Sequence, residues 1–389
     1  MQDRTGLVLA GAAARGAYEA GALSVLLPVL ESRRQRPTVL VGTSAGALNA
    51  AFLASRADRA ADAATKELLD LWLSIGRKEV FGLSLWSALD GVLNELGLGG
   101  RPQGIVDTSP LRETVDAAIG DWSQIRTNID NGHLDALAVV TTSAATGRTV
   151  VFVEGGTPSR GHPLPEFDLK KGIEYAAPIG GMDVDHVLAS AAIPILFPPI
   201  EIETGADTTD WFVDGGLRLN TPIKPAIELG VHRVAIVAAD PATHAPPAHE
   251  RPDRRPDTDD LLLHFLQAAL ADPLIEDMWT LAGVNTLLGG QAQPDGKRPI
   301  EYLFVGPSAR GELGHRAAQV VNGLGLSEFW LLSRLLGHQG GQSEELLSYL
   351  LFDPEFFEEA ADLGKHDAQD ELDRVACDDR EWRIDPIPV

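Results

Sequence analysis

Residues 5–30 read TGLVLAGAAARGAYEAGALSVLLPVL, and residues 38–55 read TVLVGTSAGALNAAFLAS. Each stretch opens with a short apolar run that predicts a buried strand. Small residues then break the run, and Leu and Ala recur at helical spacing. The order strand, turn and helix, repeated twice, is typical of a parallel α/β sheet. We expect strands at Thr5–Ala10 and Thr38–Val41, and helices at Ala17–Leu30 and Ala47–Ser55.

The same patterns extend to the rest of the chain. Helices are expected within residues 66–100, from Ser109, after Asp214 up to Gly230, and over Leu261–Leu288. Strands are expected at Leu134–Thr141, Arg148–Val153, Phe212–Val213, Val234–Ala238 and Glu301–Val305. Five prolines mark Pro241–Asp259 as an exposed loop, and three helices are expected to close the chain. The domains predicted are an α/β unit at 5–240, a loop at 241–260 and a mostly helical region at 261–389 with a strand near 300–306.

Composition excludes several classes of protein. The 389 residues include 32 basic and 56 acidic side chains, for a net charge of −24, which argues against binding nucleic acid or docking on anionic lipid by charge. A hydrophobic content of 44% is enough for a large core. Cys377 is the single cysteine, so no intrachain disulfide can form. Neither a spanning apolar run nor a signal-peptide pattern occurs, and a cytoplasmic location is expected.

The negative charge is concentrated at the end of the chain. Residues 341–389 hold 15 acidic and 4 basic side chains. Such a segment repels itself, so a solvated helical face followed by a loose end is expected.

The turn Gly42-Thr43-Ser44-Ala45-Gly46 matches the pattern G-x-S-x-G between an expected strand and an expected helix. A serine on such a turn presents its hydroxyl beyond the edge of the sheet, and the two glycines allow close crossing of the chain. The alternative is an ordinary turn of small residues. The context favours Ser44 as a nucleophile.

A second loop of small residues, Gly11-Ala12-Ala13-Ala14-Arg15-Gly16, also lies between a strand and a helix. It fits neither G-x-G-x-x-G nor the P-loop pattern. Its backbone N–H groups could hold an oxyanion, although plain packing is the simpler interpretation.

A nucleophilic serine needs a base. None of the ten histidines has a setting that distinguishes it. Asp214 ends a strand-like segment and precedes Gly215 and Gly216, so its carboxylate could reach a neighbouring serine, although an Asx turn would give the same pattern.

Three segments of the chain resemble the three motifs of the patatin-like phospholipases and occur in the same order: Gly11–Gly16, Gly42–Gly46 and Asp214–Gly216. Further similarity lies at Asp107–Leu111, Ala189–Pro194, Phe197–Pro199, Asn220–Pro222 and Gly306–Ala368. The resemblance implies a three-layer α/β/α fold with a mostly parallel sheet, followed by helices. It also implies lipid acyl hydrolysis by a dyad of Ser44 as nucleophile and Asp214 as base.

The resemblance further implies an oxyanion hole made by backbone N–H groups of Gly11, Ala12, Ala13, Ala14, Arg15 and Gly16. The family usually has glycines where this chain has Ala12 and Ala13, and alanine is strained wherever φ must be positive. Arg15 matches a basic residue of the family, with either a direct role or a role in holding the loop.

The expected partner is a lipid or ester substrate, with transient contact at a membrane surface. No metal or other cofactor is expected, because the sequence has no His-x-x-x-His or Cys-x-x-Cys pattern. Two other functions stay open: a catalytically weak lipid-binding or scaffold protein, and a Ser-His-Asp esterase on soluble esters. Apolar residues around Trp72, Trp86 and Leu83–Leu96 could line an acyl pocket or belong to the core.

Overall fold

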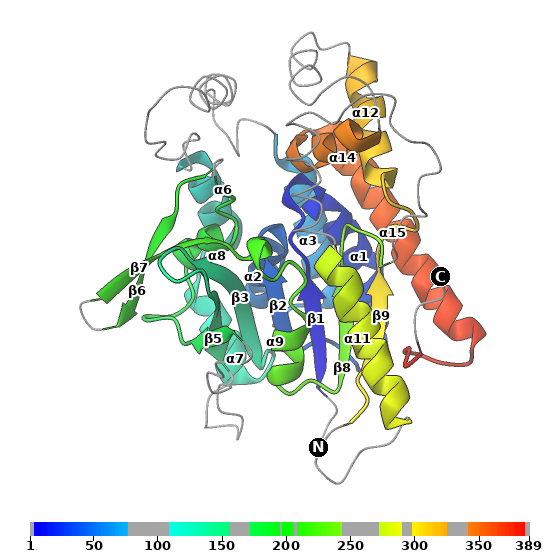
Figure 1. Cartoon of the computed structure of the whole chain (residues 1–389), viewed down its shortest axis with the longest axis horizontal. Coiled ribbons are helices and arrows are strands. Elements are labelled where there is room, and N and C mark those ends of the chain that lie inside the picture. The colour runs from blue at the N-terminus through cyan, green and yellow to red at the C-terminus, as the bar shows by residue number, and fades with distance from the viewer. Residues whose placement is uncertain are drawn as a thin grey trace.

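The computed structural model describes residues 4–76, 109–155, 172–194, 197–205, 208–242, 272–289, 298–324 and 341–385. Its strands are β1 (Thr5–Leu9), β2 (Val39–Thr43), β3 (Ala136–Ser143), β4 (Thr149–Gly155), β5 (Ile173–Ala176), β6 (Ile200–Gly205), β7 (Thr208–Asp214), β8 (Arg233–Val237) and β9 (Glu301–Val305). Within the described residues they form one sheet in the order β5-β4-β3-β2-β1-β8-β9, with β7 paired to β3 and β6 paired to β7 (Figure 1).

The centre of this sheet is parallel. Strands β3, β2, β1, β8 and β9 all pair in parallel, whereas β4 and β7 run antiparallel to β3. The fold is therefore α/β with a mostly parallel sheet, as the sequence predicts. The later strand Glu301–Val305 does return to the sheet, beside β8.

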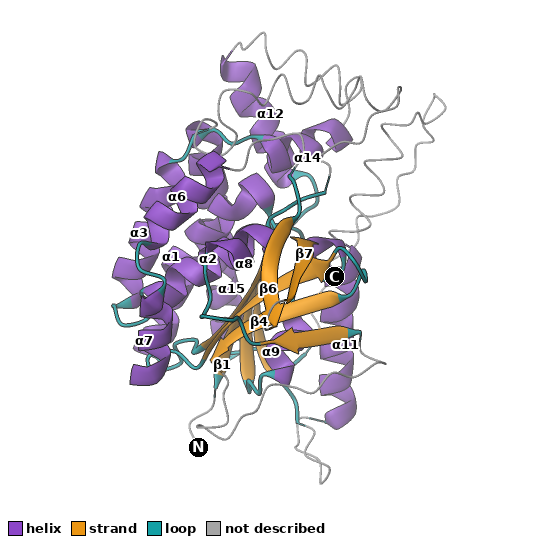
Figure 2. Ribbon diagram, turned by 90° about the vertical axis from the view of Figure 1, so that its left-hand side faces the viewer, coloured by secondary structure: helices purple, strands orange, loops and turns teal. Residues whose placement is uncertain are grey.

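Helices cover both faces of the sheet and complete three layers (Figure 2). Two described helices, α9 (Ile223–Glu228) and α11 (Asp272–Leu288), pack on one face in a core with Val8, Val41 and Ile236. The other face and its outer layers carry α1 (Gly16–Ser32), α2 (Ala45–Ser55), α3 (Ala61–Ser74), α6 (Ser109–Ile119), α7 (Ser123–Asn131), α8 (Val184–Ser190), α12 (Glu312–Leu324), α14 (Gly341–Leu350) and α15 (Pro354–Cys377).

The acidic end of the chain packs through α15 against α1. A Cβ on Gly364 would lie 2.0 Å from the Tyr18 carbonyl oxygen, so only glycine permits this close crossing. The apolar side of α15 is buried, including Phe356 and Phe357, while most of its acids face solvent. The expectation of a solvated helical face is confirmed.

The prediction of a loose end is wrong for the described residues, which extend to residue 385. Arg383 forms a backbone bridge with Tyr302 of β9, with N···O distances of 2.9 and 2.8 Å, and Trp382 is buried. The guanidinium of Arg383 also pairs with the buried Glu371, at 2.6 Å. These contacts hold the chain against the sheet, because they supply both backbone hydrogen bonds and an ion pair for Arg383.

Four helices and strands are not predicted by the sequence patterns: α7, β5, α8 and β6. Strand β6 alternates buried Ile200 and Ile202 with exposed Glu201 and Glu203, a two-residue period that indicates a strand. The stripe Leu83–Leu96, residues 243–259 of the loop and residues 261–271 lie outside the described residues. Trp72 is buried in the core, edge-on to Phe357 at 5.4 Å.

Across the described ranges, the structure has no helix long and apolar enough to cross a membrane.

Candidate active site

The parallel register brings the two loops together. Leu9 of β1 pairs with Gly42 of β2, so both strands end at the same edge of the sheet. Loop 10–16 and turn 42–46 therefore leave the sheet side by side. A Cβ on Gly11 would lie 3.4 Å from the Ser44 Cβ, which shows that the loop lies against the serine.

The turn at Ser44 is sharp and strained. Ser44 has φ 53° and ψ −125°, a conformation that non-glycine residues rarely adopt. A Cβ on Gly42 would lie 2.3 Å from the Gly46 carbonyl oxygen, and a Cβ on Gly46 would lie 2.4 Å from the Leu9 carbonyl oxygen. Both glycines are therefore required for the chain to cross itself here.

Asp214 reaches the same edge through β7. Thr43 pairs with Val140 across β2 and β3, and the next residue of β3, Thr141, pairs with Asp214. The Gly216 N–H donates to Asp214 Oδ1 at 2.6 Å. A Cβ on Gly215 would lie 2.3 Å from the Val140 carbonyl oxygen, so the turn after Asp214 packs directly on β3.

Ser44 and Asp214 form a hydrogen-bonded pair. The Ser44 hydroxyl donates to the Asp214 carboxylate, and both residues are 5% exposed. Burial raises the pKa of Asp214 to about 7, although the hydrogen bonds from Gly216 and Ser44 oppose this rise. A carboxylate with such a pKa is a much better proton acceptor near neutral pH than an ordinary aspartate.

The buried charge of Asp214 has a cost in stability. Because its pKa is raised in the folded chain, the stability it contributes is complete below pH 4 and is lost as the pH rises through about 7. The gap between a pKa of about 7 and the unfolded value is equivalent to about 4 kcal/mol. Burying an amide in its place offsets about 1–3 kcal/mol of any gain.

We expect Asp214→Asn to raise the free energy of unfolding by about 2 kcal/mol at pH 8 and to leave it unchanged or lower at pH 4. Urea unfolding at both pH values measures this difference. Asp210→Asn, on the same strand, is the control and should give no gain at pH 8. Equal effects of Asp214→Asn at the two pH values would contradict the raised pKa.

The structure reduces the number of N–H groups that could form the expected oxyanion hole. Three of the six N–H groups donate within the backbone: Gly11 to the Asn220 oxygen at 3.0 Å, Arg15 to the Ala12 oxygen at 2.9 Å, and Gly16 to the Ala13 oxygen. Among the described residues, the N–H groups of Ala12, Ala13 and Ala14 have no acceptor. These three remain candidates for holding an oxyanion.

One of the two alanines is in a glycine-like conformation. Ala13 has φ 48°, whereas Ala12 has φ −136°, which any residue can adopt. A left-handed conformation costs a non-glycine residue about 1–2 kcal/mol.

We expect Ala13→Gly to raise the free energy of unfolding by up to about 1 kcal/mol, because the relief of strain exceeds the entropy cost of glycine. Ala12→Gly is the matched control and should lower it by about 1 kcal/mol. Urea unfolding of the two variants tests the assignment, which would be wrong if both shifted in the same direction.

The Arg15 side chain is buried and contacts residues far from it in the sequence. Its guanidinium is fully buried and contacts Asp240, at 3.2 Å, and Glu345 and Ser348 of α14, at 2.6 and 2.8 Å. It also lies 3.7 Å from the centre of the Tyr349 ring. Of the two roles open from the sequence, the structure favours holding the loop.

Sequence reasoning gave no role to two residues that support the site. Ser190, at the end of α8, accepts from the Ser44 N–H at 2.8 Å and donates to the Val140 oxygen at 2.6 Å. The Asn220 Nδ2 donates a hydrogen bond to the Gly11 carbonyl oxygen at 3.2 Å, and the Gly11 N–H donates to the Asn220 carbonyl oxygen. Both residues lie in segments whose sequence is similar to the family, and this similarity could have marked them as important. Only the fold shows what they contact.

Within the described residues no histidine hydrogen-bonds to Ser44, and no group of three or more His, Cys, Asp or Glu could hold a metal ion. His186, which is buried, is bonded to Asp183 at 2.6 Å. In the described part of the chain, the Ser44 hydroxyl therefore has the Asp214 carboxylate as its side-chain partner.

The fold and the site define a three-layer α/β protein with a serine–aspartate pair at the carboxyl edge of its sheet. The family model for patatin-like phospholipases matches residues 7–227, and the chain belongs to this family. No curated protein matches it in a sequence comparison.

The solved structures to which the chain is similar share little sequence with it. The chain is 14% identical to VipD from Legionella pneumophila, with a TM-score of 0.37, covering 96% of this chain and 67% of VipD. Against human GIVD cytosolic phospholipase A2 the identity is 12% and the TM-score 0.44, covering 96% of this chain and 59% of the human chain. Against ExoU from Pseudomonas aeruginosa, solved with SpcU, the identity is 16% and the TM-score 0.31, covering 96% of this chain and 76% of the ExoU chain.

Proposed function

We propose that the chain is a serine acyl hydrolase acting on carboxylic esters of lipids. The observation that carries the proposal is the buried Ser44–Asp214 pair, in which burial raises the pKa of the aspartate to about 7. Membership of the patatin-like phospholipase family supports the choice of lipid esters.

In the proposed reaction the Ser44 hydroxyl attacks the ester carbonyl while Asp214 takes the hydroxyl proton. The negative oxygen that forms is held by N–H groups of Ala12, Ala13 and Ala14, and each such donor is typically worth about 2.7–4 kcal/mol. Asp214 then gives its proton to the departing alkoxide, which leaves as an alcohol, and Ser44 carries the acyl group. Asp214 then takes a proton from water, and the resulting hydroxide attacks the acyl ester. The Ser44 Oγ–acyl bond breaks, Asp214 returns the proton to the Ser44 oxygen, and the fatty acid leaves.

The net charge limits the lipids that such an enzyme can approach. With a charge of −24, the chain is repelled by anionic surfaces, so we propose neutral or zwitterionic lipid, or monomeric esters, as substrate. Contact with a membrane would then be apolar and transient. A cytoplasmic location belongs to the same proposal.

The test is incubation with phosphatidylcholine, phosphatidylglycerol and monoacylglycerol, and identification of released fatty acid by mass spectrometry. We expect release from the uncharged or zwitterionic lipids and its loss in Ser44→Ala, but not in Ser74→Ala, which changes an exposed serine. Release that Ser44→Ala retains would disprove the proposal.

A catalytically weak lipid-binding protein is the alternative that the strain at Ala13 favours, because a misplaced loop would impair the oxyanion hole. Stoichiometric labelling of Ser44 by a fluorophosphonate would argue for the hydrolase. Lipid binding without labelling or release would favour the alternative.

A further inference from the structure

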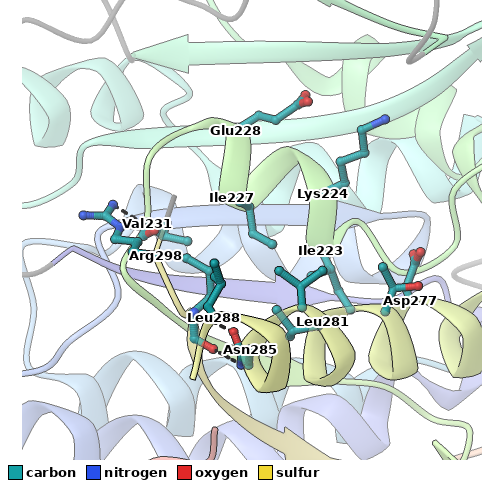
Figure 3. Close-up of a pocket in the computed structure, with 13 residues that line it drawn as sticks. Ile223, Lys224, Ile227, Glu228, Val231, Asp277, Leu281, Asn285, Leu288 and Arg298 are labelled. Atoms are coloured by element: carbon teal, nitrogen blue, oxygen red, sulfur yellow. Dashed lines mark hydrogen bonds between the residues drawn. The ribbon is translucent and has the colours of Figure 1, made fainter. Parts of the chain in front are cut away.

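A groove separate from the serine lies between α9 and α11, on one face of the sheet (Figure 3). Its volume is about 660 Å³, within the range of small-molecule sites. Its walls are mainly apolar and include Ile223, Ile227, Val231, Leu281, Leu288 and Ile300.

The groove is elongated, with polar groups at its ends. Its lining on α11 extends from Asp277 to Leu288, a rise of roughly 16 Å along the helix. Figure 3 shows Lys224 and Asp277 toward one end, and Arg298 beside Val231 toward the other. Between them lie Ile227 and Leu281. This length suits the chain of a fatty acid.

The charges of the groove are unevenly matched. Glu228 accepts from the Tyr175 hydroxyl at 2.5 Å, and Asp277 lies close enough to Lys224 for their charges to interact. Arg298 donates to the Val231 carbonyl oxygen at 3.4 Å, and no acid forms an ion pair with it among the described residues. In a chain of net charge −24, this leaves a guanidinium for an external anion.

We propose that this groove binds one long-chain fatty acid, with its chain along Ile223, Ile227 and Leu281 and its carboxylate on Arg298. Burial of the chain supplies affinity in proportion to the apolar area removed from water, and the guanidinium fixes the direction of the ligand. A fatty acid is also the product of the proposed hydrolysis. The proposal rests on that function only for the source of the ligand, not for the binding.

The test is calorimetric titration of the Ser44→Ala chain with dodecanoate, dodecanol and dodecyl phosphate. We expect Arg298→Met to weaken dodecanoate binding at least tenfold and to leave dodecanol binding unchanged. Val284→Glu places a charge on a groove residue that is 44% exposed and should weaken both ligands. Leu287→Glu, on the same helix but outside the groove and 87% exposed, is the matched control and should weaken neither.

Dodecanoate binding that survives both Arg298→Met and Val284→Glu would overturn the proposal. So would the loss of all binding once wild-type Ser44 carries a fluorophosphonate, since the ligand would then occupy the site of the serine. Tighter binding of dodecyl phosphate than of dodecanoate would assign the groove to a phosphate-headed lipid instead. Groove binding by a chain that hydrolyses nothing would refute the proposed function and leave this inference intact.

Discussion

Hydrolysis of a p-nitrophenyl ester is expected to rise with pH and to level off above an apparent pKa of about 7, the value to which burial raises Asp214. Only the deprotonated carboxylate can take the Ser44 proton, so the rate is low below this pKa and full above it. Asp214→Asn should lower kcat/KM by about 10²–10⁴ and remove the pH dependence. Steady-state rates between pH 5 and 9 measure both effects.

The Asp214→Asn variant removes the proposed base but keeps the structure around it. Its side-chain oxygen can still accept from the Gly216 N–H, which Asp214 binds at 2.6 Å, so the turn should keep its shape. Asp210→Asn is the control and should retain the wild-type profile. If Asp214→Asn stays active and a single histidine variant loses activity, the Ser-His-Asp alternative is correct.

The start of the chain predicts its structure well because its signals are local. Apolar runs, small-residue turns and helical periodicity lie within residues 5–55, and β1, α1, β2 and α2 all form there. The close crossings at Gly42 and Gly46 are made within the G-x-S-x-G turn and with the end of β1, so sequence alone could place Ser44 at a sharp turn.

Other features of the site depend on pairs far apart in sequence. Asp214 reaches Ser44 only because β7 pairs with β3, and its raised pKa comes from burial that no local pattern reports. The strain at Ala13 is likewise invisible in the sequence, since alanine is usually unstrained. Of the six expected N–H donors, three are taken by backbone acceptors that only the fold reveals.

Arg15→Met is expected to lower the free energy of unfolding by about 3–5 kcal/mol, because it leaves Asp240 and Glu345 buried without their cation. Each of these acids is no more than 6% exposed. The partners of Arg15 come from residues 239–240 and 345–349, beyond the part of the chain that the family model matches. Urea unfolding measures the loss, and a change below about 1 kcal/mol would contradict it.

The same cluster should set the geometry of the loop that carries the proposed oxyanion hole. A strained residue persists only where its surroundings fix it, and Arg15 fixes the loop two residues after Ala13. Glu345→Gln removes one charge from the cluster at little cost in volume. We therefore expect it to lower kcat by about tenfold or more, with a smaller change in KM, as hole donors move out of place.

Adding Ala13→Gly to Glu345→Gln should restore much of the lost kcat, because glycine adopts a φ of 48° without strain. Adding Ala12→Gly should restore none, since Ala12 already has an unstrained φ of −136°. A purely stabilising role for the cluster predicts a different result, in which kcat follows unfolding free energy in every variant. Rescue by the glycine at position 13 alone would separate positioning of the loop from general stability, because the two alanines are neighbours and differ in backbone strain.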